Sequence, residues 1–406
     1  MNIRLIPLSR PPDRLIAPQD ATRKGSHALA ALVAALCLVL ASSIGGHSVA
    51  YADLRDTSTP VDQLGEVSVL PDRPSTVPAD YAVTPFGYFD PSCVYEVGPT
   101  QIVVPDDEGA ALVDVSANVA ARTQLIAASA VSGRASPDTA GSTTSALDSI
   151  TAKQIAASPR VNPCAHDHYD FTGKVTAEQT AAVDSSAEEP KVAPTISGWI
   201  ESANTSSLGA MSYMHAEWNV PTAPAATVSQ TVYFFPGFEN LSGGTIIMQP
   251  VLGWHDTNFP SIPGWSAASW NCCSVGNVYH SDAFAVTGST VSGDVSSNGC
   301  STATGVCSTW AITTYDWGSQ RSTTFNTTSG GRAMNWVFGG ALEVWNLSAC
   351  NQLPGGSVTF KNFYFEDVGD YIKTPSWSIS PPSSSLSPAC GYSASVGSGN
   401  SVVLNY

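Results

Sequence analysis

From residue 196 to the C-terminus, the chain is a series of short apolar runs separated by clusters of Gly, Pro, Asn and Ser. The runs include "MHAEWNVP", "QTVYFFPGF", "TIIMQPVLGW", "STWAITTYDW" and "GSVTFKNFYFED". None of them keeps a helical period over about eleven residues. Many short strands with turn signals at this spacing predict a single all-β domain, a sandwich or barrel over residues 196–406.

Residues 53–195 have a different texture, in which Pro-rich stretches alternate with Ala/Ser/Thr-rich ones such as "VSGRASPDTAGSTTSALDS". Such stretches resemble linkers more than packed elements. Within them, "TQIVVPDDEGAALVDVSANVAARTQLIAAS" predicts a strand followed by an amphipathic helix. Residues 53–195 are therefore interpreted as a partly low-complexity pro-segment that is removed on activation. The alternative is an independent spacer or binding module.

The first 52 residues have the pattern of a secretory signal peptide. Several Arg and Lys residues precede an apolar stretch from Ala28 to Leu40, and small residues lead to an A-x-A site that ends at Ala52. The apolar stretch is shorter than the ~20 residues that a membrane span needs. We therefore expect an extracellular protein that has no membrane association once the signal is removed.

Cysteine usage agrees with export, because eight cysteines remain once Cys37 of the signal is removed. An even number in a secreted chain favours disulfide bonds. We expect Cys164 to pair with Cys93, and Cys300 with Cys307 across a small loop. Adjacent cysteines rarely bond to each other, so Cys272 and Cys273 are expected to reach different partners.

Charge excludes one class of partner, since the formal net charge of the chain is −16 at pH 7. Within residues 196–406, eleven acidic residues stand against four basic ones. This sign is opposite to the electrostatic footprint of a nucleic-acid-binding protein. A fold with so few charges cannot depend on ion pairs that fail when carboxylates protonate, which suits an acidic habitat.

The common hydrolase signatures are missing from residues 196–406, which contain no G-x-S-x-G, no H-E-x-x-H and no Asp-Thr-Gly or Asp-Ser-Gly. In "CAHDHYD", His166 and His168 alternate with Cys164 on one strand face, as zinc ligands could. No fourth ligand is evident, and Cys164 is better used in a disulfide. No metal site and no cofactor are predicted.

Two polar residues interrupt apolar strands. Gln249 lies between Met248 and Pro250, where an amide without partners costs roughly 1–3 kcal/mol. In "GGALEVWNL", the period of two places Glu343 on one strand face with Ala341 and Trp345. Burial of an unpaired carboxylate is too costly to be the default, which favours a cleft for Glu343 over a core position. A glutamate on the outer side of the sheet is the structural alternative.

The order and spacing of "WNVPTAP", "VYFFPGFEN", "IIMQPVLGW", a Trp-rich segment, "DAFAVTGSTVSGDVSS" and "GGALEVWNL" resemble those of the secreted glutamic peptidases, the eqolisin family. The resemblance covers about residues 199–367. It implies a two-sheet antiparallel β-sandwich, a concanavalin-like jelly roll, made as a pre-pro-protein. It also implies a catalytic dyad in which the family's glutamine falls on Gln249 and its glutamate on Glu343.

The chemistry explains why both residue types are needed. Peptide hydrolysis requires a base for water, a donor for the oxyanion and an acid for the leaving amine. Glu343 could take the proton from water and return it to the nitrogen, while the amide of Gln249 positions the water and donates to the oxyanion. Among the nearby aromatic residues, Trp254 is assigned a substrate-binding role.

The predicted function is therefore a secreted, acid-active endopeptidase zymogen, a monomer that acts on polypeptide substrates. One alternative keeps the jelly roll but is a glycoside hydrolase with two carboxylates, Glu343 and either Glu217 or Glu239. A further alternative is a non-enzymatic carbohydrate-binding module with exposed tryptophans. The sandwich by itself does not decide among these functions.

Overall fold

The computed structural model describes residues 77–106, 108–115, 150, 152–170, 199–227, 229–241, 246–380 and 388–406. All of them belong to one compact unit, Ser58–Tyr406. The predicted signal peptide lies outside the described residues. Within these ranges, no helix has the length and apolar character needed to cross a membrane.

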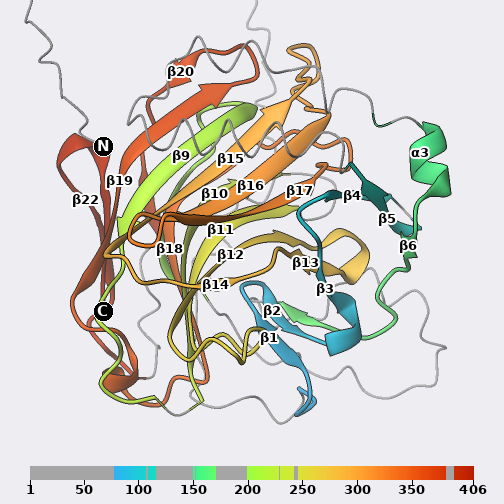
Figure 1. Ribbon diagram of the computed structural model, residues 1–406. Helices are drawn as coiled ribbons and strands as arrows, with labels where there is room; N and C mark the ends of the chain where they lie inside the picture. The colour runs from blue at the N-terminus through green and yellow to red at the C-terminus, as the bar shows by residue number, and fades with distance from the viewer. Residues whose placement is uncertain are drawn as a thin grey trace, which may run out of the picture. The chain divides into compact units, whose positions relative to one another are not determined.

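Two large sheets make up most of the fold (Figure 1). The first sheet has the strand order β21 (Ser378–Ser380), β8 (Trp199–Thr205), β18 (Trp336–Trp345), β10 (Thr231–Glu239), β11 (Ile247–Trp254), β12 (Trp265–Cys272), β13 (Val278–His280) and β3 (Val94–Glu96), with β14 (Phe284–Ala285) paired to β12. The second has the order β22 (Ser393–Val396), β23 (Val402–Asn405), β19 (Ser357–Asp367), β9 (Met211–Asn219), β15 (Thr290–Asn298), β16 (Thr309–Asp316), β17 (Arg321–Thr327), β4 (Gln101–Asp106), β5 (Gly109–Asp114) and β6 (Arg160–Val161), with β20 (Ile372–Lys373) paired to β19.

These sheets pack face to face, so that β11 and β12 of the first cross β15, β16 and β17 of the second. Where they cross, Gly293 of β15 lies directly against the ring of Pro250 in β11, and a Cβ atom at Gly293 would overlap it. The prediction of an all-β two-sheet sandwich is confirmed. Most pairings are antiparallel, as expected, and the exceptions involve N-terminal strands.

The two sheets differ in what covers their faces. In β9 of the second sheet, buried Met214, Ala216 and Trp218 alternate with half-exposed residues, which is the pattern of a sheet with one solvated face. By contrast, every residue of β11, β12 and β18 in the first sheet is buried. The first sheet is thus covered on both faces.

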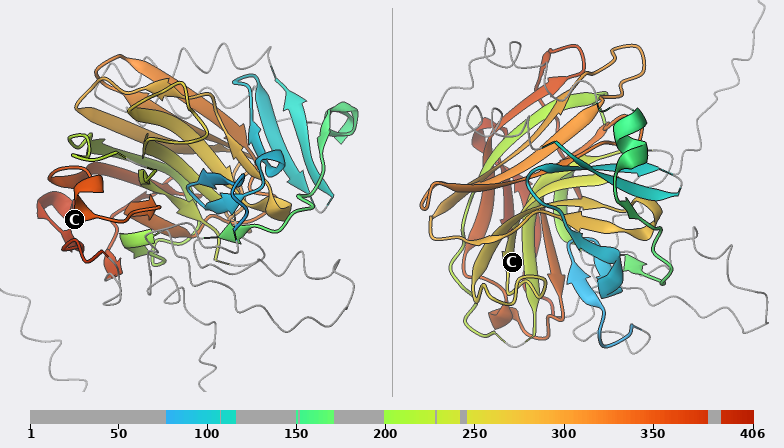
Figure 2. Two further views of the ribbon diagram at one scale, coloured as in Figure 1. Left: turned by 90° about the horizontal axis from the view of Figure 1, so that it is seen from below. Right: turned by 45° about the vertical axis from the view of Figure 1, so that its right-hand side comes forward.

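The N-terminal segment covers the face of the first sheet that points away from the second sheet. A small sheet of β1 (Ala82–Thr84), β2 (Gly87–Phe89) and β7 (Tyr169–Asp170) contributes Val83, Phe86 and Tyr88 to the same apolar core as Trp270 and Trp345. The N-terminal strands also extend both large sheets, because β3 pairs in parallel with β13, and β4 with β17. In both views of Figure 2, the blue and cyan N-terminal strands lie at one side of the sandwich.

Part of the predicted pro-segment is therefore packed structure. The strand predicted in "TQIVVPDD" is confirmed as β4, and a second strand, β5, follows it directly. The predicted helix falls mainly on residues 116–149, outside the described residues. The only short α-helix in the described ranges, α3, spans Ala152–Ala157. Composition misjudged this segment because its apolar residues pack on another part of the chain.

Two of the disulfide bonds match the pairs expected from the sequence, Cys93–Cys164 and Cys300–Cys307. A third bond joins Cys350 to Cys390. The expectation that Cys272 and Cys273 reach different partners was wrong, since the structure pairs them with each other. The other six cysteines of the described residues are bonded among themselves, so none of these is left to pair with Cys272 or Cys273.

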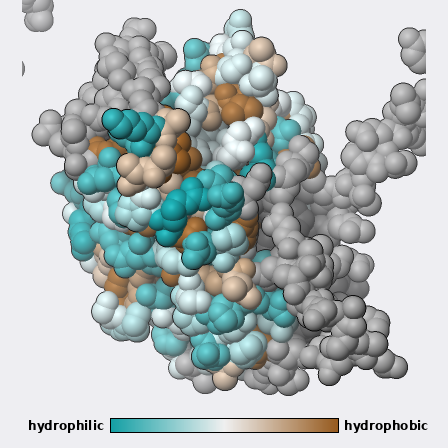
Figure 3. Space-filling model, turned by 90° about the vertical axis from the view of Figure 1, so that its right-hand side faces the viewer, coloured by the Kyte–Doolittle hydropathy of each residue, from teal (hydrophilic) through white to brown (hydrophobic). Residues whose placement is uncertain are grey.

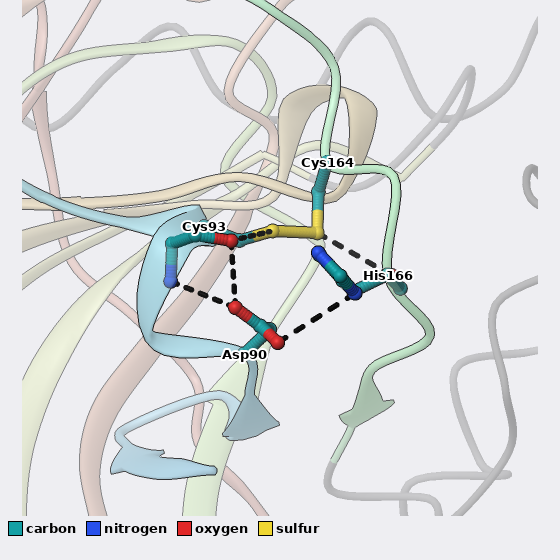
Figure 4. A network of polar contacts seen from close by, with 5 residues as sticks. Asp90, Cys93, Cys164 and His166 are labelled. Carbon is teal, nitrogen blue, oxygen red and sulfur yellow. Dashed lines mark hydrogen bonds and ion pairs between the residues drawn. A yellow bond between two sulfur atoms is a disulfide. The ribbon is translucent and has the colours of Figure 1, made fainter. Parts of the chain in front are cut away.

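The Cys93–Cys164 bond links residues 77–106 to residues 152–170 of the N-terminal segment (Figure 4). Beside it, Asp90 accepts hydrogen bonds from the backbone N and the hydroxyl of Ser92, and its Oδ2 lies 3.6 Å from His166 Nδ1. The hydrogen bond from the Ser92 hydroxyl is the main reason that the pKa of Asp90 is lowered. On the face shown in Figure 3, the described surface is mostly hydrophilic and its apolar residues are scattered.

Candidate active site

Glu343 is a fully buried carboxyl group on β18, with 0% of its surface exposed. The indole Nε1 of Trp345 donates to Glu343 Oε1 over 2.6 Å, and Trp199 of β8 is the cross-strand neighbour of Glu343. Burial raises the pKa of Glu343 well above its ordinary value, against the lowering effect of these two tryptophans. The prediction that Glu343 and Trp345 share one strand face is confirmed.

Tyr233 lies directly opposite Glu343, because the register of β10 and β18 pairs these two residues. On its other side Tyr233 pairs with Gly253 of β11, and its ring leans over that glycine, where a Cβ atom would come within 3.2 Å of the ring. The tyrosine is fully buried, and burial raises its pKa well above the ordinary value, with smaller contributions from Asp256 and Glu343. Tyr233 thus connects Glu343 to the loop that follows β11.

That loop contributes Asp256 and Asn258. The Asp256 Oδ1 accepts hydrogen bonds from the backbone N of Asn258 at 3.0 Å and from its Nδ2 at 2.8 Å. Burial raises the pKa of Asp256 to about 6, although hydrogen bonds from Asn258 oppose this rise. At acidic pH, this site therefore holds two neutral carboxyl groups, Asp256 and Glu343, on either side of Tyr233.

The backbone of the N-terminal segment completes the arrangement. The carbonyl oxygen of Val83 in β1 accepts hydrogen bonds from the Tyr233 hydroxyl at 3.2 Å and from Asn258 Nδ2 at 2.6 Å. Aromatic contacts hold the rest of the β1–β2 hairpin, since Phe86 meets Trp270 edge-on with ring centroids 6.3 Å apart, and Tyr88 meets Trp345 at 4.8 Å. The face that carries Glu343 is bound to a segment of polypeptide.

Gln249 lies on the same face but not beside Glu343. The face is shared because Gly253 pairs with Tyr233, and Gln249 is four residues before Gly253 on β11. Four residues along a strand and two strand spacings across the sheet separate the Cα atoms of Gln249 and Glu343 by roughly 16 Å. A water molecule within ~3 Å of both side chains does not fit this separation. The structure does not bring the predicted dyad together.

Even so, Gln249 is as anomalous in the structure as in the sequence. It is fully buried, and neither its amide nitrogen nor its amide oxygen has a hydrogen-bond partner among the described residues. Its neighbour on β12 is Trp270, which packs on Phe86 of the hairpin. Packing alone does not explain a buried amide that has no hydrogen-bond partner.

The register places Trp254, predicted to bind substrate, on the face opposite Glu343. Trp254 follows Gly253 on β11, so its side chain points to the opposite face from Gly253, Tyr233 and Glu343. It is 9% exposed and packs edge-on against Trp265. Its position is that of a core residue, which the sequence could not reveal because the strand's orientation was unknown.

The carboxylates of the glycoside hydrolase alternative do not face Glu343 either. Glu217 lies on β9 of the second sheet, where its Oε2 accepts from Asn362. Glu239 lies six residues beyond Tyr233 on β10, roughly 20 Å along the strand. The sequence reasoning missed Asp256, which approaches Glu343 through Tyr233. A local signal was available, since "HDTN" places an Asp two residues before an Asn, a common turn pattern.

The histidines considered as zinc ligands have other surroundings. His168 is buried and stacks on Phe89 with ring centroids 4.8 Å apart, and burial lowers its pKa to about 4. Cys164 is used in its disulfide bond. Across the described ranges, no group of three or more His, Cys, Asp or Glu side chains is placed to hold a metal ion.

Comparisons with known proteins give a limited picture. No family model matches the chain, and no curated protein matches it. Among solved structures, it is similar to scytalido-glutamic peptidase with a transition-state analogue inhibitor, at 15% identity and a TM-score of 0.36. A second structure of that peptidase, with a peptide-based analogue, gives 15% and 0.33. SCP-B, a member of the eqolisin family in complex with the tripeptide Ala-Ile-His, gives 16% and 0.31.

Each of these alignments covers 52% of this chain and 98% of the other. At such scores they carry no argument about this chain. The class that its own topology defines is an all-β sandwich of two packed sheets.

Proposed function

We propose that this chain is the precursor of a secreted endopeptidase in which Glu343 is the acid/base group. One observation carries the proposal: an extended piece of polypeptide, β1, lies on the sheet face that holds a buried carboxyl group, and polar side chains of that face hold its backbone carbonyl. A site that binds backbone atoms suits a polypeptide substrate better than a sugar.

The state of Glu343 fits a precursor. A carboxyl group acts as general base only when ionised, and burial in the precursor favours the neutral form of Glu343 by raising its pKa. Departure of residues 77–89 would admit water, lower the penalty on the charged form and free the surface on which substrate binds. Glu343 would then remove a proton from water and deliver it to the leaving nitrogen.

Gln249 has a separate part in this proposal. Because it lies too far from Glu343 to share one water molecule, we assign it to the binding of substrate backbone elsewhere on the same face. Its amide can donate and accept at once, as a peptide group requires. The unpartnered state of both amide atoms in the covered face supports this role.

Casein digestion between about pH 2 and 7, in the range where carboxyl groups titrate, tests the proposal. Pepstatin and EDTA are present throughout. Wild type, after removal of its pro-segment, is compared with Glu343→Gln and with Glu201→Gln processed in the same way, a matched control that changes another buried carboxyl group on the neighbouring strand β8. We expect digestion by wild type and control, and a loss of at least ~100-fold for Glu343→Gln. Full activity of correctly folded Glu343→Gln would refute the proposal.

A further inference from the structure

We infer that Tyr233 and Asn258 form a binding site for a peptide carbonyl beside Glu343, and that Val83 of the same chain occupies this site in the precursor. The inference rests on the proposed function and deepens it, because it names residues that hold the substrate and the segment that blocks them. The ligand class is an extended polypeptide with an apolar side chain at the residue whose carbonyl is bound, as Val83 has.

The geometry of the donors is the first argument. The Tyr233 hydroxyl and Asn258 Nδ2 come from different elements, β10 and the loop after β11, and converge on a single oxygen atom. Two converging donors on one carbonyl are the arrangement by which acyl-transfer sites stabilise the oxyanion. Tyr233 and Glu343 are direct cross-strand partners, so their Cα atoms are about 5 Å apart.

The second argument is that the donors are held in place by groups other than the hairpin. Asn258 donates one amide hydrogen to Asp256 Oδ1 at 2.8 Å, which leaves the other for the carbonyl. The ring of Tyr233 is fixed over Gly253 and is fully buried. If Val83 left, both donors would still point at the same place. The amide hydrogen that Asn258 gives to Val83 would then lack its acceptor, so the site would favour another carbonyl.

The position of Val83 is the third argument. In the small sheet β1 is an edge strand, with β2 on one side only. The carbonyl of Val83 therefore points away from β2 and toward the first sheet, as a substrate strand would present its own carbonyl. Val83 is itself buried, at 1% exposure, so its side chain is enclosed along with its carbonyl group.

Hydrogen–deuterium exchange on the full-length precursor tests this site without any need for activity. Tyr233→Phe and Asn258→Leu each remove one donor to Val83. Tyr279→Phe, which removes a buried hydroxyl from β13 of the same sheet, is the matched control. We expect exchange of the peptide covering Tyr81–Phe89 to rise roughly fivefold in each variant, the loss of about one hydrogen bond, and not in the control.

The second measurement uses casein digestion by the processed protein. If the pair binds the developing oxyanion, Tyr233→Phe lowers kcat by ~100-fold or more and leaves KM nearly unchanged. Tyr233→Phe removes a single oxygen atom, so it keeps the test valid should Asn258→Leu fail to fold. Unchanged exchange at Tyr81–Phe89 in Tyr233→Phe overturns the inference.

The two readouts separate the inference from the proposed function. If exchange rises in the variants but wild type never cuts casein, the carbonyl site stands and the peptidase proposal fails. If wild type cuts casein while Tyr233→Phe keeps its kcat and its exchange, the peptidase proposal stands and this inference fails.

Discussion

Trp345 and Glu343 lie two residues apart on one face of β18, and the indole of Trp345 donates to the carboxyl group of Glu343 over 2.6 Å. The alternation of a β-strand creates this contact, because residues i and i+2 project from the same face. The indole favours the ionised form of Glu343 and so opposes the effect of burial on its pKa. Trp345 therefore lowers the pKa of Glu343, the proposed base.

Trp345→Phe is expected to raise the pKa of Glu343 further, because a donor to the carboxylate is lost. A base works only when ionised, so activity of the processed protein should fall first at low pH and its acid limb should move to higher pH. A pH–rate profile of kcat/KM measures this shift. Trp310→Phe, a buried tryptophan on β16 of the second sheet, is the control. An acid limb that stays in place or moves to lower pH contradicts the role of Trp345.

Gln249→Leu separates a functional glutamine from a structural one. The change removes two buried polar atoms without partners and keeps a similar volume, so the free energy of unfolding should rise by about 1–3 kcal/mol. If Gln249 binds substrate backbone, activity falls at the same time. Urea unfolding and casein digestion measure the two effects.

Asn271→Leu is the matched control for Gln249→Leu, since it removes a buried amide that does donate, to the Ile247 carbonyl at 3.1 Å. This variant should be less stable than wild type. A Gln249→Leu protein that loses stability, or that gains stability and keeps full activity, argues against a functional role for Gln249.

Hydrophobic periodicity was enough to predict the sandwich and the face shared by Glu343 and Trp345. It could not predict the register between strands, which depends on partners far away in the sequence. Periodicity marks Gln249 and Glu343 as anomalous, but their pairing rests on the resemblance to the glutamic peptidases, and four residues of register separate them in the structure. Nor could periodicity show which face of the sheet carries Trp254.

The N-terminal segment shows a different limit. Val83, Phe86 and Tyr88 are few apolar residues in a Pro-rich context, and they form no core of their own. Their partners, Trp270 and Trp345, lie more than 180 residues later in the chain. Composition within a window cannot detect such a contact. Tyr233, Asp256 and Asn258 were missed for the same reason, because their roles appear only when β1 is in place.

Gly293→Ala tests the packing of the two sheets. A Cβ atom at Gly293 would overlap the ring of Pro250 in the facing sheet, where backbone on one side and a rigid ring on the other leave little room to adjust. Overpacking of this kind costs typically 1–3 kcal/mol. Gly264→Ala is the control, because its Cβ atom would meet only Trp254, at an ordinary 3.8 Å. Equal midpoints of urea unfolding for the two variants would contradict this packing.

Because of Glu201, the free energy of unfolding increases as the pH falls. This carboxyl group is 2% exposed, and burial raises its pKa to about 8 from 4.5. Below about pH 4.5 both folded and unfolded states are protonated and no penalty exists. As pH rises from about 4.5 to 8, the unfolded state ionises first, so the free energy of unfolding falls by up to ~1.4 kcal/mol per pH unit.

Urea unfolding at about pH 4, 6 and 8 measures this slope, and Glu201→Gln should reduce it. Glu217 provides a control of opposite sign, since its pKa is lowered, chiefly by His215, whose Nε2 lies 3.8 Å from Glu217 Oε1. The ionised carboxylate of Glu217 adds to the free energy of unfolding above the ordinary pKa of glutamate, and this addition disappears in acid. Glu217→Gln should lack it. A slope unchanged in Glu201→Gln contradicts the buried neutral state of Glu201.

His168 makes the N-terminal segment respond to acid in the opposite direction. Burial against Phe89 lowers its pKa to about 4 from 6.5, so the unfolded segment takes up a proton first as pH falls through this range. Stability of the segment is lost between about pH 6.5 and 4, while that of the sandwich increases. Nearby Asp90, whose pKa is lowered, stays ionised in this window and keeps its contact with His166.

We therefore expect exchange of the peptide covering Tyr81–Phe89, corrected for the intrinsic rate, to increase between about pH 6.5 and 4 in the full-length precursor. His168→Phe keeps an aromatic ring on Phe89 without a titrating group, and it should remove most of this increase. His255→Phe, at a half-buried histidine in the loop after β11, should leave the increase intact. If acid loosens the hairpin equally in His168→Phe, protonation of His168 is not what uncovers the face of Glu343.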